Sequence, residues 1–217
     1  MSISSGGPGS YFSQERPELV ARLPAALGRV LDVGCGAGGV GRAIRARADR
    51  LVGIELDPAA ASAAQEVYDE VLIGRVEDMI GELTGPFDTI LAYDVLEHLA
   101  DPGAVLRRLR PLAAPQALLH VSLPNARHWT LLRDLVVRGT FGYTDWGHRD
   151  RTHLRWLTRS DLVRLLEENG WRVERTLHPP LTAAGRLAER LTRGRSADFS
   201  VYQWSALARP GDVLVEM

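Results

Sequence analysis

The chain has 217 residues, of which 45% are hydrophobic and 24% are charged, enough for one substantial buried core and most consistent with a single main domain. Its formal net charge of -1 argues against a nucleic-acid or anionic-membrane partner, because proteins that bind such partners usually carry a marked excess of basic residues. All 26 basic residues are arginines, so a Walker-type phosphate loop and Schiff-base chemistry, which both need a lysine, are excluded.

The first fifteen residues predict a flexible tail or lid in front of a domain over residues 16–217. They lack the charged and apolar regions of a secretory signal, and no later apolar run approaches the length of a membrane span. The single cysteine, Cys35, permits no internal disulfide. We therefore expect a cytoplasmic protein without a membrane partner.

The next part of the chain alternates between short apolar runs and helical patterns. Apolar spacing predicts helices over 16–27 and about 39–48, and two Asp-Pro pairs, at Asp57 and Asp101, predict further helix starts because aspartate caps a helix and proline suits its first position. Strands are predicted at VLDV, LVGIEL, EVLIG, FDTILAYD and ALLHVSL. These runs are apolar on both faces, as in a parallel sheet covered by helices, so the pattern indicates an α/β doubly wound fold.

After Pro124 the regular alternation stops. A short helix is expected over 128–138 and an aromatic, glycine-broken loop over 139–153, and we interpret residues 125–156 or so as a cap. A helix over 158–169, the strand WRVERTL, a basic amphipathic helix over 181–191 and a last strand FSVYQWSALA are expected to follow.

The glycine-rich stretch RVLDVGCGAGGVGRAI, residues 29–44, matches the dinucleotide pattern G-x-G-x-x-G twice. A loop that enters a helix N-terminus suits anions, but Asp32 stands two residues before the first glycine. A carboxylate there would repel a diphosphate and attract a ligand with an ammonium and a sulfonium group. The turn therefore favours S-adenosylmethionine, with Glu55 placed as a ribose-binding acid, while a nicotinamide oxidoreductase stays open as an alternative.

Six sequence blocks follow one another in order between about Tyr11 and Leu177: VLDVGCGAG, GIELDP, VEDM, FDTILAYDVLEHLADP, VSLPNARHW and RDRTHLRWLT. Together they resemble the class I S-adenosylmethionine-dependent methyltransferases. The similarity is greatest to the small-molecule branch that includes ubiquinone-biosynthesis O-methyltransferases and glycosyltransferase-associated methyltransferases. The resemblance implies a Rossmann-like seven-stranded sheet with an antiparallel last strand and an inserted cap after strand five.

The same resemblance assigns cofactor contacts. It places the first turn at the methionine end of the cofactor, Glu55 at the ribose, Val76 and Glu77 at the adenine, and Asp94 near the methyl group. Arg75 departs from the acidic or amide residue usual before the adenine-facing pair. The expected cofactor-binding residues are Tyr11, Arg16, Asp32, Gly34, Cys35, Gly36, Gly38, Glu55, Leu56, Val76, Glu77 and Asp94.

An alcohol or phenol acceptor must lose a proton during methylation, so we looked for a base. If DVLEHL is helical, Asp94, Glu97 and His98 share one face, and His98 is a candidate general base. His148 and His153 form a second candidate pair. Relatives with a similar block bind a divalent metal, which implies Asp94, Glu97, His98 and His153 as possible ligands.

The resulting hypothesis is O-methylation of a small metabolite, such as a sugar, a phenol or quinone-like compound, or a natural-product intermediate. Methylation of a small amine is the nearest alternative, because an amine needs a base less. A non-catalytic partner subunit that binds the cofactor without turnover is a third possibility. The sequence does not indicate the acceptor or an oligomeric state.

Overall fold

The computed structural model describes residues 15–179, 183–192 and 196–211, so Tyr11 lies outside the described part. Its contacts divide the chain into two compact units, residues 1–92 with 108–118 and residues 93–107 with 119–217. The strands are β1 (Gly28–Val33), β2 (Ala48–Glu55), β3 (Glu70–Ile73), β4 (Phe87–Tyr93), β5 (Ala113–Pro124), β6 (Trp171–Leu177) and β7 (Gln203–Pro210).

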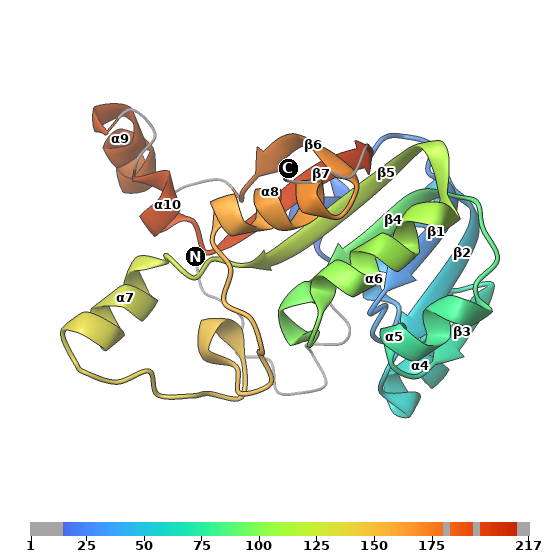
Figure 1. The fold of residues 1–217 in the computed structure, drawn as a ribbon, viewed down its shortest axis with the longest axis horizontal. Helices are drawn as coiled ribbons and strands as arrows, with labels where there is room; N and C mark the ends of the chain where they lie inside the picture. Colours follow the sequence, from blue (N-terminus) through green and yellow to red (C-terminus); the bar gives the residue numbers. More distant parts are fainter. Residues whose placement is uncertain (1–14, 180–182, 193–195, 212–217) are drawn as a thin grey trace. The chain divides into compact units, whose positions relative to one another are not determined.

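The seven strands hydrogen-bond in the order β3-β2-β1-β4-β5-β7-β6 (Figure 1). β1 runs parallel to β2 and β4, and β2 runs parallel to β3. β7 is antiparallel to both β5 and β6. The predicted Rossmann-like sheet with an antiparallel last strand is therefore confirmed.

In the first unit, the fully buried residues of β1, β2 and β4 form the core, and α4 packs against β2 and β3. The predicted helix start at Asp57 is confirmed, since the Asp57 carboxylate accepts the Ala60 N–H at 2.8 Å and Pro58 begins the helix. The helices and 3₁₀ turns of this unit are α2 (Pro17–Val20), α3 (Gly39–Ile44), η1 (Arg45–Arg47), α4 (Pro58–Ala64), α5 (Val76–Met79), η2 (Ile80–Glu82) and η4 (Arg110–Leu112).

The predicted helix over 16–27 is wrong, because α2 ends at Val20. Pro24 lacks an N–H and disfavours a helical conformation in the residue before it, so the helix does not continue through residue 24 although the apolar spacing is helical. The Arg47 guanidinium donates to the carbonyls of Val20 and Leu23, at 3.3 and 2.7 Å, and thereby stabilises the irregular segment.

In the second unit, α8 lies along β6 and β7 (Figure 1). Trp171, the first residue of β6, is fully buried, and its indole N–H donates to the Leu106 carbonyl at 3.0 Å. Thr158 and Asp161 form a capping box at the start of α8. The helices and 3₁₀ turns are η3 (Leu96–His98), α6 (Pro102–Leu109), α7 (Trp129–Val136), η5 (Gly147–Arg149), α8 (Arg159–Glu168), α9 (Ala183–Leu191) and α10 (Ala197–Ser200).

The last strand begins four residues later than expected, at Gln203 rather than at Phe199. The preceding residues form α10 instead, because the N–H groups of Phe199 and Ser200 both donate to the Ser196 carbonyl. Within the described ranges, no helix has both the length and the apolar character that crossing a membrane requires.

Candidate functional site

The glycine turn after β1 is built on left-handed backbone. Gly34, Gly36 and Gly38 have φ angles of 75°, 53° and 83°, which only glycine adopts without strain. These three residues lie between the end of β1 and the start of α3, so their left-handed conformations determine the path of this turn. All three positions therefore favour glycine for backbone geometry, whatever ligand the turn binds.

The N–H groups of this turn are engaged within the protein. Gly34 and Cys35 donate to the Ile54 carbonyl at 2.8 and 3.1 Å, and Gly38 donates to the Cys35 carbonyl at 3.1 Å. Gly36 donates to the Glu55 carboxylate at 2.8 Å. A diphosphate needs such N–H groups as donors, so the turn is poorly suited to one.

Two buried acids flank the turn instead. Asp32 lies on β1 opposite Gly53 of β2 with only 2% of its surface exposed, and Glu55 ends β2. Burial, with a contribution from Glu55, raises the pKa of Asp32 to about 7, although a hydrogen bond from Tyr68 opposes the shift. Ionised Asp32 would be stabilised by a cationic ligand group, which fits the predicted ammonium and sulfonium of the cofactor.

Glu55 uses each carboxylate oxygen once, accepting the N–H groups of Gly36 and Asp57 at 2.8 and 2.9 Å. A carboxylate has about four acceptor positions, so two remain for ribose hydroxyls. Cys35 is buried against Gly53, and burial raises the pKa of its thiol. The thiol is thus a packing group, and only the Cys35 backbone belongs to the turn.

Other residues expected to bind the cofactor differ in exposure. Leu56 is 65% exposed, whereas Val76 is buried at the start of α5. Arg75, the residue that departs from the family pattern, forms an ion pair with Glu77 at 3.1 Å. Arg16, also expected near the cofactor, has a φ of 47° and accepts the N–H groups of Leu19 and Val20 at the start of α2.

The predicted helical face of Asp94, Glu97 and His98 is wrong. Asp94 has a φ of 55°, and only Leu96–His98 forms a helical turn, of the 3₁₀ type, so the spacing rule of an α-helix does not apply. The Asp94 carboxylate instead accepts hydrogen bonds from Ser122 and Gln203. Two strands of the second unit, β5 and β7, therefore hold this carboxylate in place.

Glu97, His98 and His153 come together, with their candidate ligand atoms within 4.8 Å of one another. The fourth residue of the predicted metal set, Asp94, is not in this group. The His98 and His153 rings meet edge to face with centroids 4.7 Å apart. The backbone fixes the arrangement further, since Leu154 and Arg155 donate to the Glu97 carbonyl.

The protonated nitrogen of His98 can be assigned from its partners. Its Nδ1 lies 3.3 Å from the Thr152 carbonyl, which only accepts, so Nδ1 carries the proton. The Thr152 hydroxyl lies 3.1 Å from the same nitrogen and donates its own proton to Asp150 at 2.7 Å. The Nε2 atom of His98 therefore keeps a lone pair for a proton or a metal ion.

His153 is largely buried beside His98. Burial, followed by the neighbouring His98, lowers the pKa of His153, so its ring is held neutral and can offer a lone pair. The donor set of one carboxylate and two imidazoles thus fits a divalent ion such as Mn²⁺ or Zn²⁺.

His148 is placed differently from the other two candidate bases. Its Nε2 donates to the Tyr202 carbonyl at 2.7 Å, and its ring stacks on His128 at a centroid distance of 4.9 Å. Burial lowers the pKa of His148 to about 4. A neutral, weakly basic imidazole bonded in this way suits packing of the cap better than proton transfer.

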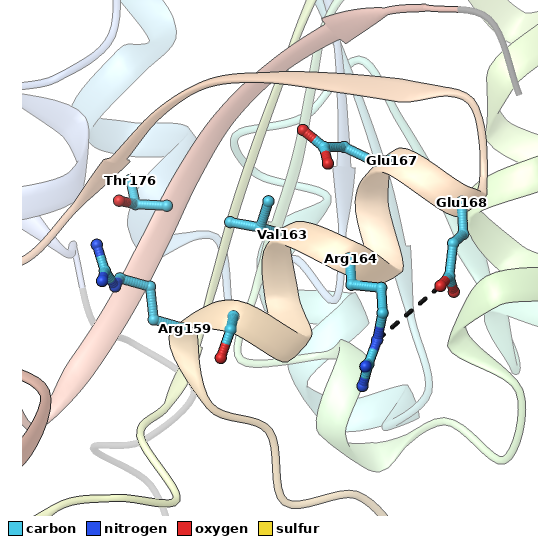
Figure 2. A pocket seen from close by; sticks show the side chains of 7 residues that line it. Arg159, Val163, Arg164, Glu167, Glu168 and Thr176 are labelled. Carbon is cyan, nitrogen blue, oxygen red and sulfur yellow. Dashed lines mark ion pairs between the residues drawn. The ribbon is translucent and has the colours of Figure 1, made fainter. Parts of the chain in front are cut away.

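Two surface hollows lie in the second unit. One, of about 460 Å³, runs along α8 and β6, and Figure 2 shows Arg164 and Glu168 paired at its edge, 3.9 Å apart. The other, of about 700 Å³, is lined in part by Arg155 and Trp156. Of the predicted catalytic and cofactor-binding residues that the structure describes, none lines either hollow.

Sequence reasoning missed Tyr68 and Thr152. Tyr68 donates to Asp32 from the polar stretch QEVYDE, where its only signal is a lone aromatic residue before a strand. Thr152 stands beside the predicted His153, but its contact with His98 joins residues 54 positions apart. Neither contact can be read from local spacing.

Comparisons with known proteins agree with this geometry. A family profile described as a methyltransferase domain matches residues 10–176. The ubiquinone biosynthesis O-methyltransferase of Xanthomonas oryzae pv. oryzae is 30% identical over 185 residues, which cover 78% of this chain and 74% of the relative. The enzyme of the same description from Xylella fastidiosa is 33% identical over 110 residues, covering 48% of this chain and 45% of the relative.

Solved structures show the same fold. A methyltransferase from Archaeoglobus fulgidus has a TM-score of 0.66 at 16% identity, covering 85% of this chain and 87% of that one. The magnesium protoporphyrin IX methyltransferase of Synechocystis, solved with bound S-adenosylhomocysteine, has a TM-score of 0.59 at 18% identity over 94% of this chain and 83% of that one. With the family profile spanning most of its length and a turn unsuited to a dinucleotide, the chain belongs to the class I S-adenosylmethionine-dependent methyltransferases.

Proposed function

We propose that this methyltransferase methylates an oxygen atom of a small acceptor, such as a sugar, a phenol or quinone-like compound, or a natural-product intermediate. The observation that carries the proposal is His98, whose Nδ1 proton is held by Thr152 so that Nε2 can accept a proton. An oxygen acceptor needs such a base, because it must lose its proton as the new bond forms. The description of the Xanthomonas relative as an O-methyltransferase supports the same choice.

The first unit would bind the cofactor. Asp32 would face its ammonium group, the backbone of the glycine turn its methionine chain, and Glu55 its ribose hydroxyls. Leu56 offers an exposed apolar surface to the adenine ring. When bound, S-adenosylmethionine supplies an electrophilic methyl group, and the protein's share of the rate then comes from alignment and from exclusion of water.

The second unit would activate the acceptor, and its geometry supports two routes. In the first, Nε2 of His98 removes the proton from the acceptor oxygen. In the second, Glu97, His98 and His153 would hold a divalent metal ion, which would supply Lewis acidity toward that oxygen. The two routes exclude each other at His98, because one lone pair cannot bind both a metal ion and a proton.

The test is a methyl-transfer assay over a panel of phenols, sugars and amines, before and after exhaustive chelation. For the His98 base, we expect activity on a hydroxyl acceptor that survives chelation and falls about 10²- to 10⁴-fold in His98→Gln. Loss of activity on chelation, with recovery on adding Mn²⁺ or Zn²⁺, would favour the metal route.

Two other results would contradict the proposal. A His98→Gln variant that methylates an amine at the full rate would favour the N-methyltransferase alternative. If the protein binds S-adenosylhomocysteine but transfers no methyl group to any member of the panel, the result favours a partner subunit without turnover.

A further inference from the structure

Tyr68 is a buried residue of the first unit that belongs to none of the family's sequence blocks. It lies between α4 and β3, and its hydroxyl is 2.5 Å from the Asp32 carboxylate. Burial raises the pKa of Tyr68, so the phenol keeps its proton. The Tyr68 hydroxyl donates that proton in its hydrogen bond to the Asp32 carboxylate.

Two glycines make room for this side chain. A Cβ atom at Gly41 would lie 2.4 Å from Cε2 of the Tyr68 ring, which is far closer than atoms can pack. A Cβ atom at Gly53 would lie 3.2 Å from Cδ1 of the same ring. The last glycine of the second G-x-G-x-x-G match, Gly41, is therefore required by a phenol within the protein, independently of any ligand.

In the part of the chain that the structure describes, no cationic side chain pairs with Asp32 to balance its charge. The titratable groups acting on it are the Tyr68 hydroxyl and the Glu55 carboxylate, and the Asp32 charge in turn acts on the Cys35 thiol. Among the described residues, no arginine or histidine forms an ion pair with Asp32. The carboxyl group thus depends on one hydrogen bond from Tyr68 for its ionised form.

We propose that Tyr68 is a positioning residue for Asp32, and that binding of the cofactor drives a proton from the Asp32 carboxyl group into solvent. The O–H bond of that group breaks, its electron pair stays on the carboxylate, and the proton passes to buffer. The carboxylate then accepts from Tyr68 on one side and faces the ligand's ammonium on the other. The inference rests on the proposed placement of the ammonium at Asp32.

The experiment is calorimetric titration with S-adenosylhomocysteine at pH 6.5, in two buffers of different ionisation enthalpy. The ligand keeps its ammonium group at this pH, so a proton counted in the buffer comes from the protein. From the pKa of about 7 for Asp32, we expect release of roughly three quarters of a proton per ligand bound. Binding without proton release in the wild-type protein would overturn the proposal without the need of any variant.

Variants separate the two residues. We expect Asp32→Asn to bind more weakly at pH 8 and to release no proton. Tyr68→Phe removes the hydrogen bond that favours the ionised carboxyl group, so the pKa of Asp32 rises and affinity at pH 6.5 falls roughly tenfold, with partial recovery at pH 8.5. The partial recovery at high pH distinguishes this effect from damage to the pocket.

Tyr93→Phe is the matched control, because it also removes a buried phenol hydroxyl, bonded to His120 at 2.8 Å in the second unit. It should bind with wild-type affinity and wild-type proton release. If Asp32→Asn binds as well as the wild type, the proposed placement of the ammonium fails. If Asp32→Asn is weakened but Tyr68→Phe matches Tyr93→Phe, only the role of Tyr68 fails.

Discussion

Replacing Asp32 with asparagine should make the unliganded protein more stable at neutral and alkaline pH. Its carboxyl group has a pKa of about 7 in the fold, against 3.8 ordinarily, chiefly because burial disfavours the charged form. The folded state therefore holds a proton that the unfolded state has lost, and the wild type loses stability as pH rises from about 4 to about 7. Asparagine keeps the acceptor for Tyr68 and has no charge to bury.

The magnitude follows from about 1.4 kcal/mol for each pKa unit. Between pH 5 and pH 8, the stability advantage of Asp32→Asn over the wild type should grow by about 3 kcal/mol, or roughly 6 to 12 °C in Tm for a chain of this size. Comparing the two pH values removes any constant cost of burying the amide. Urea denaturation at each pH measures the difference.

The control is Asp145→Asn, which removes a carboxylate that is 81% exposed and paired with Arg151. Its difference from the wild type should stay within about 0.5 kcal/mol at both pH values. An Asp32→Asn advantage of equal size at pH 5 and pH 8 would refute the reasoning, because the carboxyl group would then not be protonated in the fold.

Three further predictions concern named contacts. Gly41→Ala should lower the free energy of unfolding by about 1–3 kcal/mol, because the added methyl group would clash with the Tyr68 ring. Gly81→Ala is the control, since a Cβ atom there would lie 3.8 Å from its nearest neighbouring atom, and it should not lower stability in this way. Equal denaturation midpoints for the two variants would contradict the prediction. Thr152→Val should slow methyl transfer roughly tenfold while Thr152→Ser retains it, and equal rates for the two would remove the role of the Thr152 hydroxyl. Glu97→Gln should weaken Mn²⁺ binding at least about tenfold by calorimetry while Asp94→Asn leaves it unchanged, and a loss in Asp94→Asn would restore the four-residue set.

The elements that sequence reasoning predicted well are those with local signals. The Asp-Pro pairs at Asp57 and Asp101 marked helix starts, because capping involves only neighbouring residues, and both carboxylates accept an N–H three residues later. The parallel strands were predictable because a run that is apolar on both faces must be buried on both. The antiparallel last strand came from the family resemblance.

The parts that failed depend on local backbone exceptions or on distant contacts. Helical spacing over 16–27 and over DVLEHL suggested α-helix, but Pro24 and the left-handed Asp94 interrupt it. Asp32 was noticed for its charge, yet its dependence on Tyr68 joins residues 36 positions apart. No periodicity in one sequence reports such a pair.

The carboxylate of Glu55 ties the N–H of Gly36 to that of Asp57, whose own side chain caps α4. The loop after β1 and the loop after β2 are thus linked by hydrogen bonds in the free protein. Because these loops are already ordered, they lose little conformational entropy when the cofactor binds, and the cofactor binds to a site that is already formed. Association should accordingly be fast, and hydrogen exchange at Gly36 and Asp57 should already be slow in the free protein.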